Sequence, residues 1–302
     1  MVIRMPSFSK IVIADAMEPP VVEGLKALGP VVLTPSSLKA ELADAEVLIV
    51  RSATKVTEEL VSAAPRLRIV ARAGVGLDNV DKAACEKRHI EVLNTPGASS
   101  NAVAEMAVGM MLALMRNFGR AHASMKVGVW DKKNCTGHEV SGKTLGLIGM
   151  GRIGRLVAAK AISLGMRVVY SDPKKASDVS YPHYQSVDEL LPLCDIVSLH
   201  ASLPAGSPPI LSAERISKMR KGSYVINTAR GFLIDEAALA SALQSGHLAG
   251  AALDVFPTEP YSGPLIKLDN VLLTPHIAAS TAEAQERIGD DLISQLKQKL
   301  TA

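Results

Sequence analysis

The stretch TLGLIGMGRIG, residues 144–154, decides how the rest of this 302-residue chain is interpreted. An apolar run leads into Gly149, Gly151 and Gly154, spaced as GxGxxG, and a helix-forming segment follows. In such a turn the first glycine permits a tight bend, the second lets the backbone approach a pyrophosphate, and the third lets the helix pack closely on the strand. The free N–H groups at the start of the helix can then bind phosphate oxygens. We therefore expect a strand–turn–helix unit that binds a dinucleotide.

A second strand, RVVYSDP (167–173), supports this interpretation because it ends in Asp172, 18 residues after Gly154. A carboxylate at this place accepts hydrogen bonds from the ribose hydroxyls and repels a 2′-phosphate. The cofactor expected from the residues is NAD rather than NADP. Lys174 and Lys175 follow closely, and their charges would weaken that preference. The alternative is a glycine-rich turn with a surface aspartate, which the complete βαβ context disfavours.

Short β-branched runs alternate with alanine-rich helical segments on both sides of this stretch, which is typical of an α/β fold with parallel sheets. One long helical segment, beginning near residue 98, separates two series of strands, so we predict two doubly wound domains. The segments expected to contain strands are 10–15, 47–50, 68–72 and 90–94 in the first series, and 144–154, 167–173, 194–200, 223–231, 250–256 and 270–276 in the second. A last amphipathic helix is expected at about 281–299.

Composition excludes several classes of protein. With 48% apolar and 21% charged residues the chain should be globular, and its net charge of +3 and 3% aromatic residues argue against a nucleic-acid partner. The longest apolar stretch, residues 106–115, is too short to cross a bilayer. The three cysteines form no CxxC pair, so no metal site and no disulfide framework is expected. No secretory signal is visible, and we expect a cytoplasmic protein.

Ionisable side chains follow three successive strands of the second series. Arg230 ends VINTARG, Asp254 and Glu259 lie in ALDVFPTEP, and His276 ends LLTPH. Ligands of doubly wound sheets bind beyond the carboxyl ends of the strands. An arginine can grip a carboxylate through two hydrogen bonds, and a glutamate beside a histidine holds the imidazole in one orientation for proton transfer. These residues fit hydride transfer on a 2-hydroxy acid, although each of them alone could be an ordinary surface residue.

The segments LGLIGMGRIG, VINTARG, ALDVFPTEP and TPHIAAS resemble the signatures of the D-isomer-specific 2-hydroxyacid dehydrogenases, and the resemblance covers almost the whole chain. It implies a catalytic trio of Arg230, Glu259 and His276. It implies a Rossmann NAD-binding domain at residues 97–280, a smaller flavodoxin-like substrate-binding domain built from 1–96 and 281–302, and an active site in the cleft between them. Two helices, at about 98–118 and 281–297, are expected to join the two domains. It also implies a homodimer, with a tetramer as the alternative. The NAD contacts that it implies are Gly149, Gly151, Arg152, Ile153, Gly154, Asp172, Ala201, Thr228, Ala229, Asp254, Ala278 and Ala279.

Further segments, RSATKVT (51–57), RAGVGLDNVD (72–81) and ASMKVGVWDKKN (123–134), resemble the branch of that family that oxidises D-3-phosphoglycerate in serine biosynthesis. The substrate residues expected from this resemblance are Arg51, Ser52, Gly74, Val75 and Arg230, with Lys132 or Lys133 of a second subunit. Two positions depart from many members of the family: Ala278 stands in place of glycine, and Ser99 in place of asparagine. The chain stops at Ala302, and we expect it to lack the C-terminal regulatory domains of longer members, and therefore feedback by serine.

Two alternatives remain open. The first is a reductase of glyoxylate, hydroxypyruvate or another 2-oxo acid from the same family, against which Asp172 and RSATKVT argue. The second is a non-catalytic NADH-sensing protein similar to the corepressors that resemble this family, against which the intact catalytic trio argues.

Overall fold

A computed structural model describes residues 7–204 and 206–301, and the chain divides into two compact units. Unit 1 is Met1–Ser99 with Ser280–Ala302, and unit 2 is Ser100–Ala279. The divisions that the family resemblance implies, 96/97 and 280/281, differ from these by three residues and by one residue. Each unit is a parallel sheet covered by helices on both faces, so the predicted α/β fold class is confirmed.

Unit 2 contains a seven-stranded parallel sheet in the order β12-β11-β10-β9-β6-β7-β8. Counted along this unit the order is 3-2-1-4-5-6-7, which is the Rossmann order extended by one strand. The central strands are almost continuously apolar because helices cover both faces of the sheet. The strands are β6 (Thr144–Ile148), β7 (Arg167–Ser171), β8 (His183–Tyr184), β9 (Ile196–Leu199), β10 (Ser223–Asn227), β11 (Leu248–Leu253) and β12 (Val271–Leu273).

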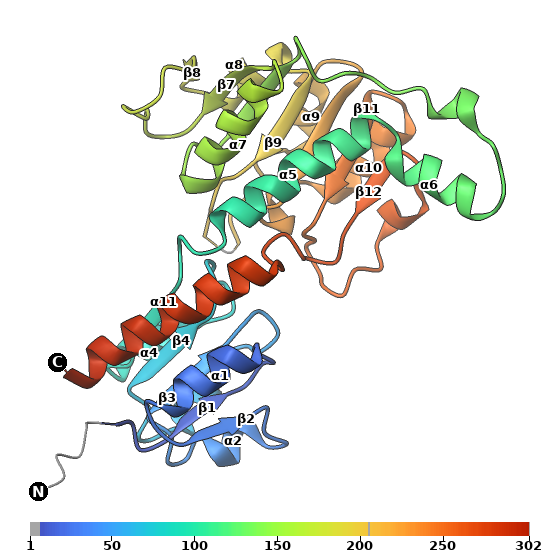
Figure 1. The fold of residues 1–302 in the computed structure, drawn as a ribbon. Helices are drawn as coiled ribbons and strands as arrows, with labels where there is room; N and C mark the ends of the chain where they lie inside the picture. The colour runs from blue at the N-terminus through green and yellow to red at the C-terminus, as the bar shows by residue number, and fades with distance from the viewer. Residues whose placement is uncertain (1–6, 205, 302) are drawn as a thin grey trace, which may run out of the picture. The chain divides into compact units, whose positions relative to one another are not determined.

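Helices α5 (Ser100–Met115) and α7 (Arg152–Ser163) lie side by side on one face of this sheet (Figure 1). The opposite face is covered by α8 (Val187–Leu190), α9 (Ala213–Lys218) and α10 (Glu236–Gln244). The remaining helical segments of unit 2 are α6 (Phe118–Lys126) and the short 3-10 turns Lys132–Cys135, Leu191–Leu193, Gly231–Leu233 and Pro264–Lys267.

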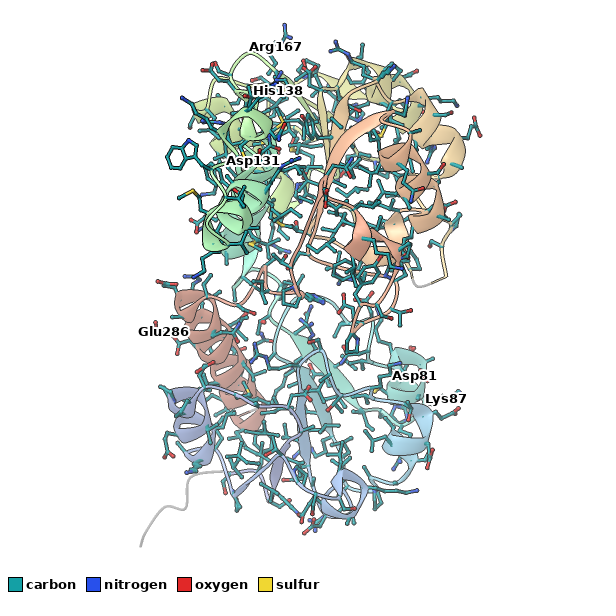
Figure 2. All side chains as sticks on the ribbon, turned by 90° about the vertical axis from the view of Figure 1, so that its right-hand side faces the viewer. Asp81, Lys87, Asp131, His138, Arg167 and Glu286 are labelled. Carbon is teal, nitrogen blue, oxygen red and sulfur yellow. The ribbon has the colours of Figure 1, made fainter. Side chains whose placement is uncertain are left out.

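Unit 1 contains a five-stranded parallel sheet in the flavodoxin-like order β2-β1-β3-β4-β5. Its strands are β1 (Ile11–Ile13), β2 (Val31–Leu33), β3 (Val47–Val50), β4 (Ile69–Arg72) and β5 (Glu91–Asn94). One face packs against α1 (Pro19–Lys26) and α11 (Ala282–Thr301), and the other against α2 (Leu38–Glu41), α3 (Glu58–Ser62) and α4 (Lys82–Lys87). Asp81 and Lys87, labelled in Figure 2, mark the two ends of α4, and the Asp81 carboxylate caps it by accepting from the Ala84 N–H at 2.9 Å.

The sequence missed several elements, three of them very short, and the end of one helix. It did not predict β2, α2 or β8, each of which has four residues or fewer. The long helix expected at about 98–118 ends at Met115, because Asn117 adopts a left-handed conformation (φ 54°) and a new helix, α6, starts at Phe118. Asparagine tolerates that conformation better than most residues.

Candidate active site

The glycine turn after β6 has the geometry that its sequence predicts. Gly149 has φ +101°, and a Cβ there would lie 2.7 Å from the His200 carbonyl carbon. A Cβ on Gly154 would lie 2.2 Å from the Gly149 oxygen, so α7 packs directly on the turn. Gly151 is different, because a Cβ there would meet nothing within 4 Å. The space next to Gly151 is therefore open to a ligand, at the point where α7 begins and its N–H groups are free.

Asp172 follows β7 and is attached to the same turn. Its Oδ2 accepts from the Met150 N–H at 2.8 Å, and its Oδ1 accepts from the Lys174 N–H at 3.0 Å. A carboxylate oxygen can accept more than one hydrogen bond, so both oxygens keep acceptor capacity for ribose hydroxyls. Its negative charge is held beside the turn by the backbone and does not depend on a flexible side-chain partner.

Two buried polar atoms near this turn have no hydrogen-bond partner within the described residues: Thr228 Oγ1 and His200 Nδ1. Thr228 follows β10 and His200 follows β9, so both lie beyond the carboxyl edge of the sheet. Buried polar atoms normally have partners, and a ligand with donors and acceptors would supply them. Burial lowers the pKa of His200 to about 4, so its ring is neutral at pH 7 and can donate or accept. The open turn, Asp172 and these two atoms fit a dinucleotide. The sequence predicted Thr228 and missed His200, although SLH ends a strand in the same way as LLTPH.

The acid–base pair is formed by His276 and Glu259. His276 Nδ1 lies 2.8 Å from Glu259 Oε2, and Glu259 Oε1 accepts from the Phe256 N–H at 3.0 Å. The side chains are 42% and 37% exposed, so the pair is accessible to a substrate. Because the carboxylate faces Nδ1, it favours the tautomer with hydrogen on Nδ1, and Nε2 carries the lone pair.

Asp254 holds the backbone on both sides of His276. The residue is 0% exposed, and its Oδ1 accepts from Thr274 Oγ1 at 2.6 Å and from the Ile277 N–H at 2.8 Å. Its Oδ2 accepts from the Ala278 N–H at 2.8 Å. His276 itself has φ 54°, a left-handed conformation that is strained for a residue other than glycine. The sequence suggested Asp254 as a cofactor contact, and the structure adds that it supports the turn that carries His276.

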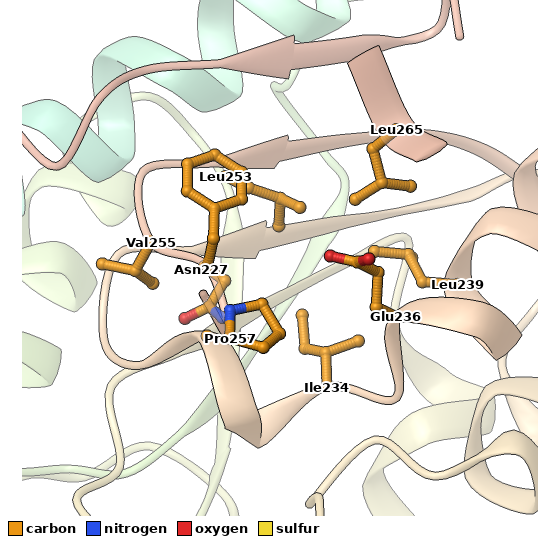
Figure 3. A pocket seen from close by; sticks show the side chains of 10 residues that line it. Asn227, Ile234, Glu236, Leu239, Leu253, Val255, Pro257 and Leu265 are labelled. Carbon is orange, nitrogen blue, oxygen red and sulfur yellow. The ribbon is translucent and has the colours of Figure 1, made fainter. Parts of the chain in front are cut away.

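Arg230 lies in the turn after β10, and its Nη1 donates to the Ala229 carbonyl oxygen at 2.7 Å. The next residue, Gly231, packs against the loop that carries Glu259: a Cβ at Gly231 would lie 1.9 Å from the Phe256 carbonyl carbon. The two loops are therefore in direct backbone contact. The small pocket at this junction has a volume of about 10 Å³, which is room for one water molecule and not for a substrate (Figure 3).

The register of the sheet places these loops next to one another. Asn227, the last residue of β10, pairs with Leu253 of β11, which in turn pairs with Leu273 of β12. The three loops thus start one residue later, side by side at one edge. Adjacent strands are about 4.8 Å apart, so the first and third loops begin roughly 10 Å from each other. This sheet edge brings the predicted catalytic residues into one region of unit 2.

The residues predicted to bind substrate in unit 1 lie at the carboxyl ends of β3 and β4. Arg51 Nη2 donates to Gln285 Oε1 at 2.6 Å, and Arg51 Nη1 donates to the Ala16 oxygen at 3.2 Å. The Arg51 N–H and the Thr54 hydroxyl both donate to the Asp15 carboxylate, at 2.5 and 2.6 Å. The loop that contains Arg51 and exposed Ser52 is therefore fixed to the end of β1, which is the switch point of this sheet.

The second predicted substrate loop contains Gly74 and Val75. Gly74 has φ +143°, and a Cβ there would lie 1.8 Å from Arg72 Nη1. The Arg72 guanidinium therefore lies directly against the Gly74 backbone. The Val75 oxygen accepts from Asn94 Nδ2 at 2.7 Å, which ties this loop to the end of β5. A cationic side chain that the sequence did not single out, Arg72, thus lies beside the predicted carboxylate-binding amides.

Metal sites, membrane-spanning helices and disulfides can be examined in the residues that the structure describes. In residues 7–204 and 206–301, no group of three or more histidine, cysteine or acidic side chains could hold a metal ion. Over the same residues, no helix combines the length and apolarity needed to cross a membrane. Cys85, Cys135 and Cys194 are free thiols.

Comparisons with known proteins identify the family of this chain. Residues 108–278 match the family model described as D-isomer specific 2-hydroxyacid dehydrogenase, NAD binding domain. The chain is 47% identical to a hydroxypyruvate reductase of Thermotoga maritima over 85% of both chains. It is 44% identical to D-3-phosphoglycerate dehydrogenase of Rattus norvegicus, over 95% of this chain and 55% of that protein. It superposes on the D-lactate dehydrogenase of Aquifex aeolicus, solved with NAD and lactic acid, with a TM-score of 0.86, 33% identity and coverage of 97% and 96%.

Proposed function

Because the chain belongs to the D-isomer-specific 2-hydroxyacid dehydrogenases, an NAD-binding family, we propose that it oxidises D-3-phosphoglycerate to 3-phosphohydroxypyruvate. The observation that carries the chemistry is the 2.8 Å contact between His276 Nδ1 and Glu259, next to the loop of Arg230. It supplies a proton acceptor and an anion-binding group at one edge of a dinucleotide-binding sheet.

His276 removes the proton of the substrate hydroxyl through Nε2, since Nδ1 faces Glu259. Glu259 keeps the ring oriented and balances the positive charge that the imidazole gains. Arg230 binds the substrate carboxylate and draws electron density from the forming carbonyl. Bound NAD would supply the acceptor for the hydride that leaves C2 of the substrate. In the reverse direction the same imidazolium returns its proton to the carbonyl oxygen.

The residues proposed to hold NAD form three groups. The glycine turn and the start of α7 receive the pyrophosphate, and Asp172 receives the ribose hydroxyls. Thr228 and its neighbours at the strand ends would line the part of the site that holds the nicotinamide ring. The complete proposed set is Gly149, Gly151, Arg152, Ile153, Gly154, Asp172, Ala201, Thr228, Ala229, Asp254, Ala278 and Ala279. Ala278 is 4% exposed, so little of its methyl group reaches the surface that a nicotinamide would contact.

Support for a phosphorylated substrate comes from the cationic side chains of unit 1 and from the similarity to phosphoglycerate dehydrogenase over 95% of the chain. Arg51 uses two of its five N–H donors on protein oxygens. The remaining donors fit a phosphate, while the amides of Ser52, Gly74 and Val75 fit the carboxylate. Serine biosynthesis would then be the pathway.

Hydroxypyruvate reduction is the second candidate, favoured by the 47% identity to the Thermotoga maritima enzyme. The discriminating measurement is kcat/KM for 3-phosphohydroxypyruvate, hydroxypyruvate and glyoxylate with NADH at 340 nm. We expect the phosphorylated acid to be preferred at least tenfold, about 1.4 kcal/mol. Arg51→Gln should raise KM for that acid alone, whereas Lys55→Gln, on the same loop, should change little. Faster turnover of hydroxypyruvate would replace the first candidate by the second.

A non-catalytic NADH sensor is tested by the same absorbance assay. His276→Ala should lower turnover at least 100-fold, within the usual contribution of an acid–base group, while the Kd for NADH stays within about threefold. Absence of NADH oxidation by the unmodified chain with all these 2-oxo acids would favour the sensor.

We also propose that the protein is a homodimer formed through the α6 region of unit 2. Large apolar side chains are exposed there in a short segment: Phe118, Met125, Val127, Val129 and Trp130, the last 78% exposed. Such clustering is typical of an interface. Lys132 and Lys133 follow at once and are exposed, and in the proposed dimer they would contact a ligand of the second subunit. Sedimentation should give a dimer, and Trp130→Glu should give a monomer; a monomeric unmodified chain would contradict the proposal.

A further inference from the structure

We infer that Asn227 is a positioning residue that fixes the direction of Arg230. The inference rests on the proposed function, in which Arg230 binds the substrate carboxylate. Neither the sequence motifs nor the predicted catalytic trio assigns Asn227 a role.

The side chain of Asn227 spans the turn that carries Arg230. Its Nδ2 donates to the Arg230 carbonyl oxygen at 2.8 Å, and its Oδ1 accepts from the Ala229 N–H at 3.0 Å. One amide thus holds an acceptor and a donor of the turn at the same time. The residue is 1% exposed, so water does not compete for these two bonds.

The backbone of Asn227, which carries this amide, is itself fixed. Asn227 ends β10, where it pairs with Leu199 of β9 on one side and Leu253 of β11 on the other. Its carbonyl oxygen accepts from the Asp254 N–H at 2.9 Å, at the start of the loop that carries Glu259. The Asn227 amide therefore holds the Arg230 backbone at a fixed position relative to the central sheet.

No other residue of similar size offers both functions. Aspartate keeps the acceptor but presents an oxygen to the Arg230 carbonyl, and leucine keeps neither. The pocket lined by Asn227, Gly231 and Pro257 leaves almost no room for a larger side chain such as glutamine (Figure 3). An amide of this length is thus required by the geometry of the turn.

A double-mutant cycle on the full chain tests the inference. Oxalate, a dicarboxylate without a hydroxyl to oxidise, is titrated into the NADH-saturated enzyme and followed calorimetrically. Asn227→Ala should weaken oxalate binding at least tenfold. In the background of Arg230→Ala the same change should weaken it less than twofold, because Asn227 acts through Arg230. The Kd for NADH should change less than the Kd for oxalate.

Asn270→Ala is the matched control, because Asn270 Nδ2 also donates to two backbone carbonyls, of Leu243 and Ala249, but at the opposite edge of the sheet. It should lower the thermal midpoint and leave oxalate binding within twofold. If Asn227→Ala does not fold, Asn227→Asp takes its place with the same expected loss.

Two results would overturn the inference: oxalate binding unchanged by the Asn227 variant, or an equal loss with and without Arg230. If Arg230→Ala alone leaves oxalate binding unchanged, the proposed role of Arg230 fails instead.

Discussion

Replacing Asp254 by asparagine tests how the turn of His276 is held. The carboxylate accepts three hydrogen bonds, from Thr274 Oγ1, the Ile277 N–H and the Ala278 N–H. Asparagine has nearly the same shape but only one acceptor atom. If the asparagine oxygen faces Thr274 and Ile277, its NH₂ group faces the Ala278 N–H. Two hydrogen-bond donors then point at each other, and because Ala278 is only 4% exposed, water cannot separate them.

The expected cost follows from these contacts. One hydrogen bond to a charged group contributes about 1.5–3 kcal/mol, and a buried donor left without a partner costs a similar amount. We therefore expect the turn to lose about 2–3 kcal/mol. The left-handed conformation of His276 is itself unfavourable by about 1–2 kcal/mol, so the loss falls on a segment that is already strained. A change of 2–3 kcal/mol shifts a conformational equilibrium by a factor of about 30–150.

The assay is steady-state turnover combined with NADH titration by fluorescence. Asp254→Asn should lower kcat at least tenfold, because His276 leaves its orientation, and the Kd for NADH should change less than threefold. Thr274→Val, which removes one hydroxyl donor and keeps the carboxylate, should lower kcat by less than threefold. The reasoning is refuted if Asp254→Asn leaves kcat unchanged and raises only the Kd or KM for the nucleotide, since Asp254 would then act only as a cofactor contact.

Three further predictions concern other parts of unit 2. Gly231→Ala should lower the thermal midpoint and kcat together, because a Cβ 1.9 Å from the Phe256 carbonyl carbon forces the two catalytic loops apart, and calorimetry with unchanged midpoint would contradict this. Acid should destabilise the protein through His200: its folded pKa of about 4 lies below its ordinary value of 6.5, so stability is full above pH 6.5 and falls by up to about 3 kcal/mol as the pH drops through 4. Urea titrations from pH 7 to 4 should show a smaller loss for His200→Gln, and an equal loss would remove His200 as the cause. Asp172→Ser should raise kcat/KM for NADP relative to NAD at least tenfold, because the charge that repels a 2′-phosphate is lost and Lys174 remains nearby; an unchanged ratio would place selectivity elsewhere.

The sequence predicted the fold well because its strongest signals are local. Apolar β-branched runs such as VLIV (47–50) are buried on both faces of the sheet, and the GxGxxG spacing identifies the first strand of the nucleotide-binding unit. The missed strands lack such a signal. β2 (VVL) is apolar but has only three residues directly after a Gly-Pro turn, which is too short a run to identify a strand, and β8 (HY) has only two residues and no apolar β-branched residue.

The candidate site was predictable in its residue types but not in its supporting contacts. Arg230, Glu259 and His276 were proposed because each follows a recognisable strand, and their catalytic roles stay a prediction. The left-handed conformation of His276 has no sequence signal, since it results from hydrogen bonds to Asp254, 22 residues earlier in the chain. The amide of Asn227 was overlooked for a similar reason: within VINTARG it appears only as the last residue of a strand.

Each catalytic loop needs its own supporting side chain, because the sheet fixes only the first residue of the loop. Parallel strands deliver three loops to one edge at a spacing of about 4.8 Å, but this spacing fixes only where each loop begins. Arg230 and His276 lie two or three residues further on, where rotation about the φ and ψ bonds of the intervening residues would leave the positions of their side chains undetermined. A buried polar side chain at the strand end removes that freedom: Asn227 for the first loop and Asp254 for the third. The Asp254 N–H also donates to the Asn227 backbone oxygen, a bond that side-chain substitutions keep, so the two supports start from one fixed backbone position but act on separate loops.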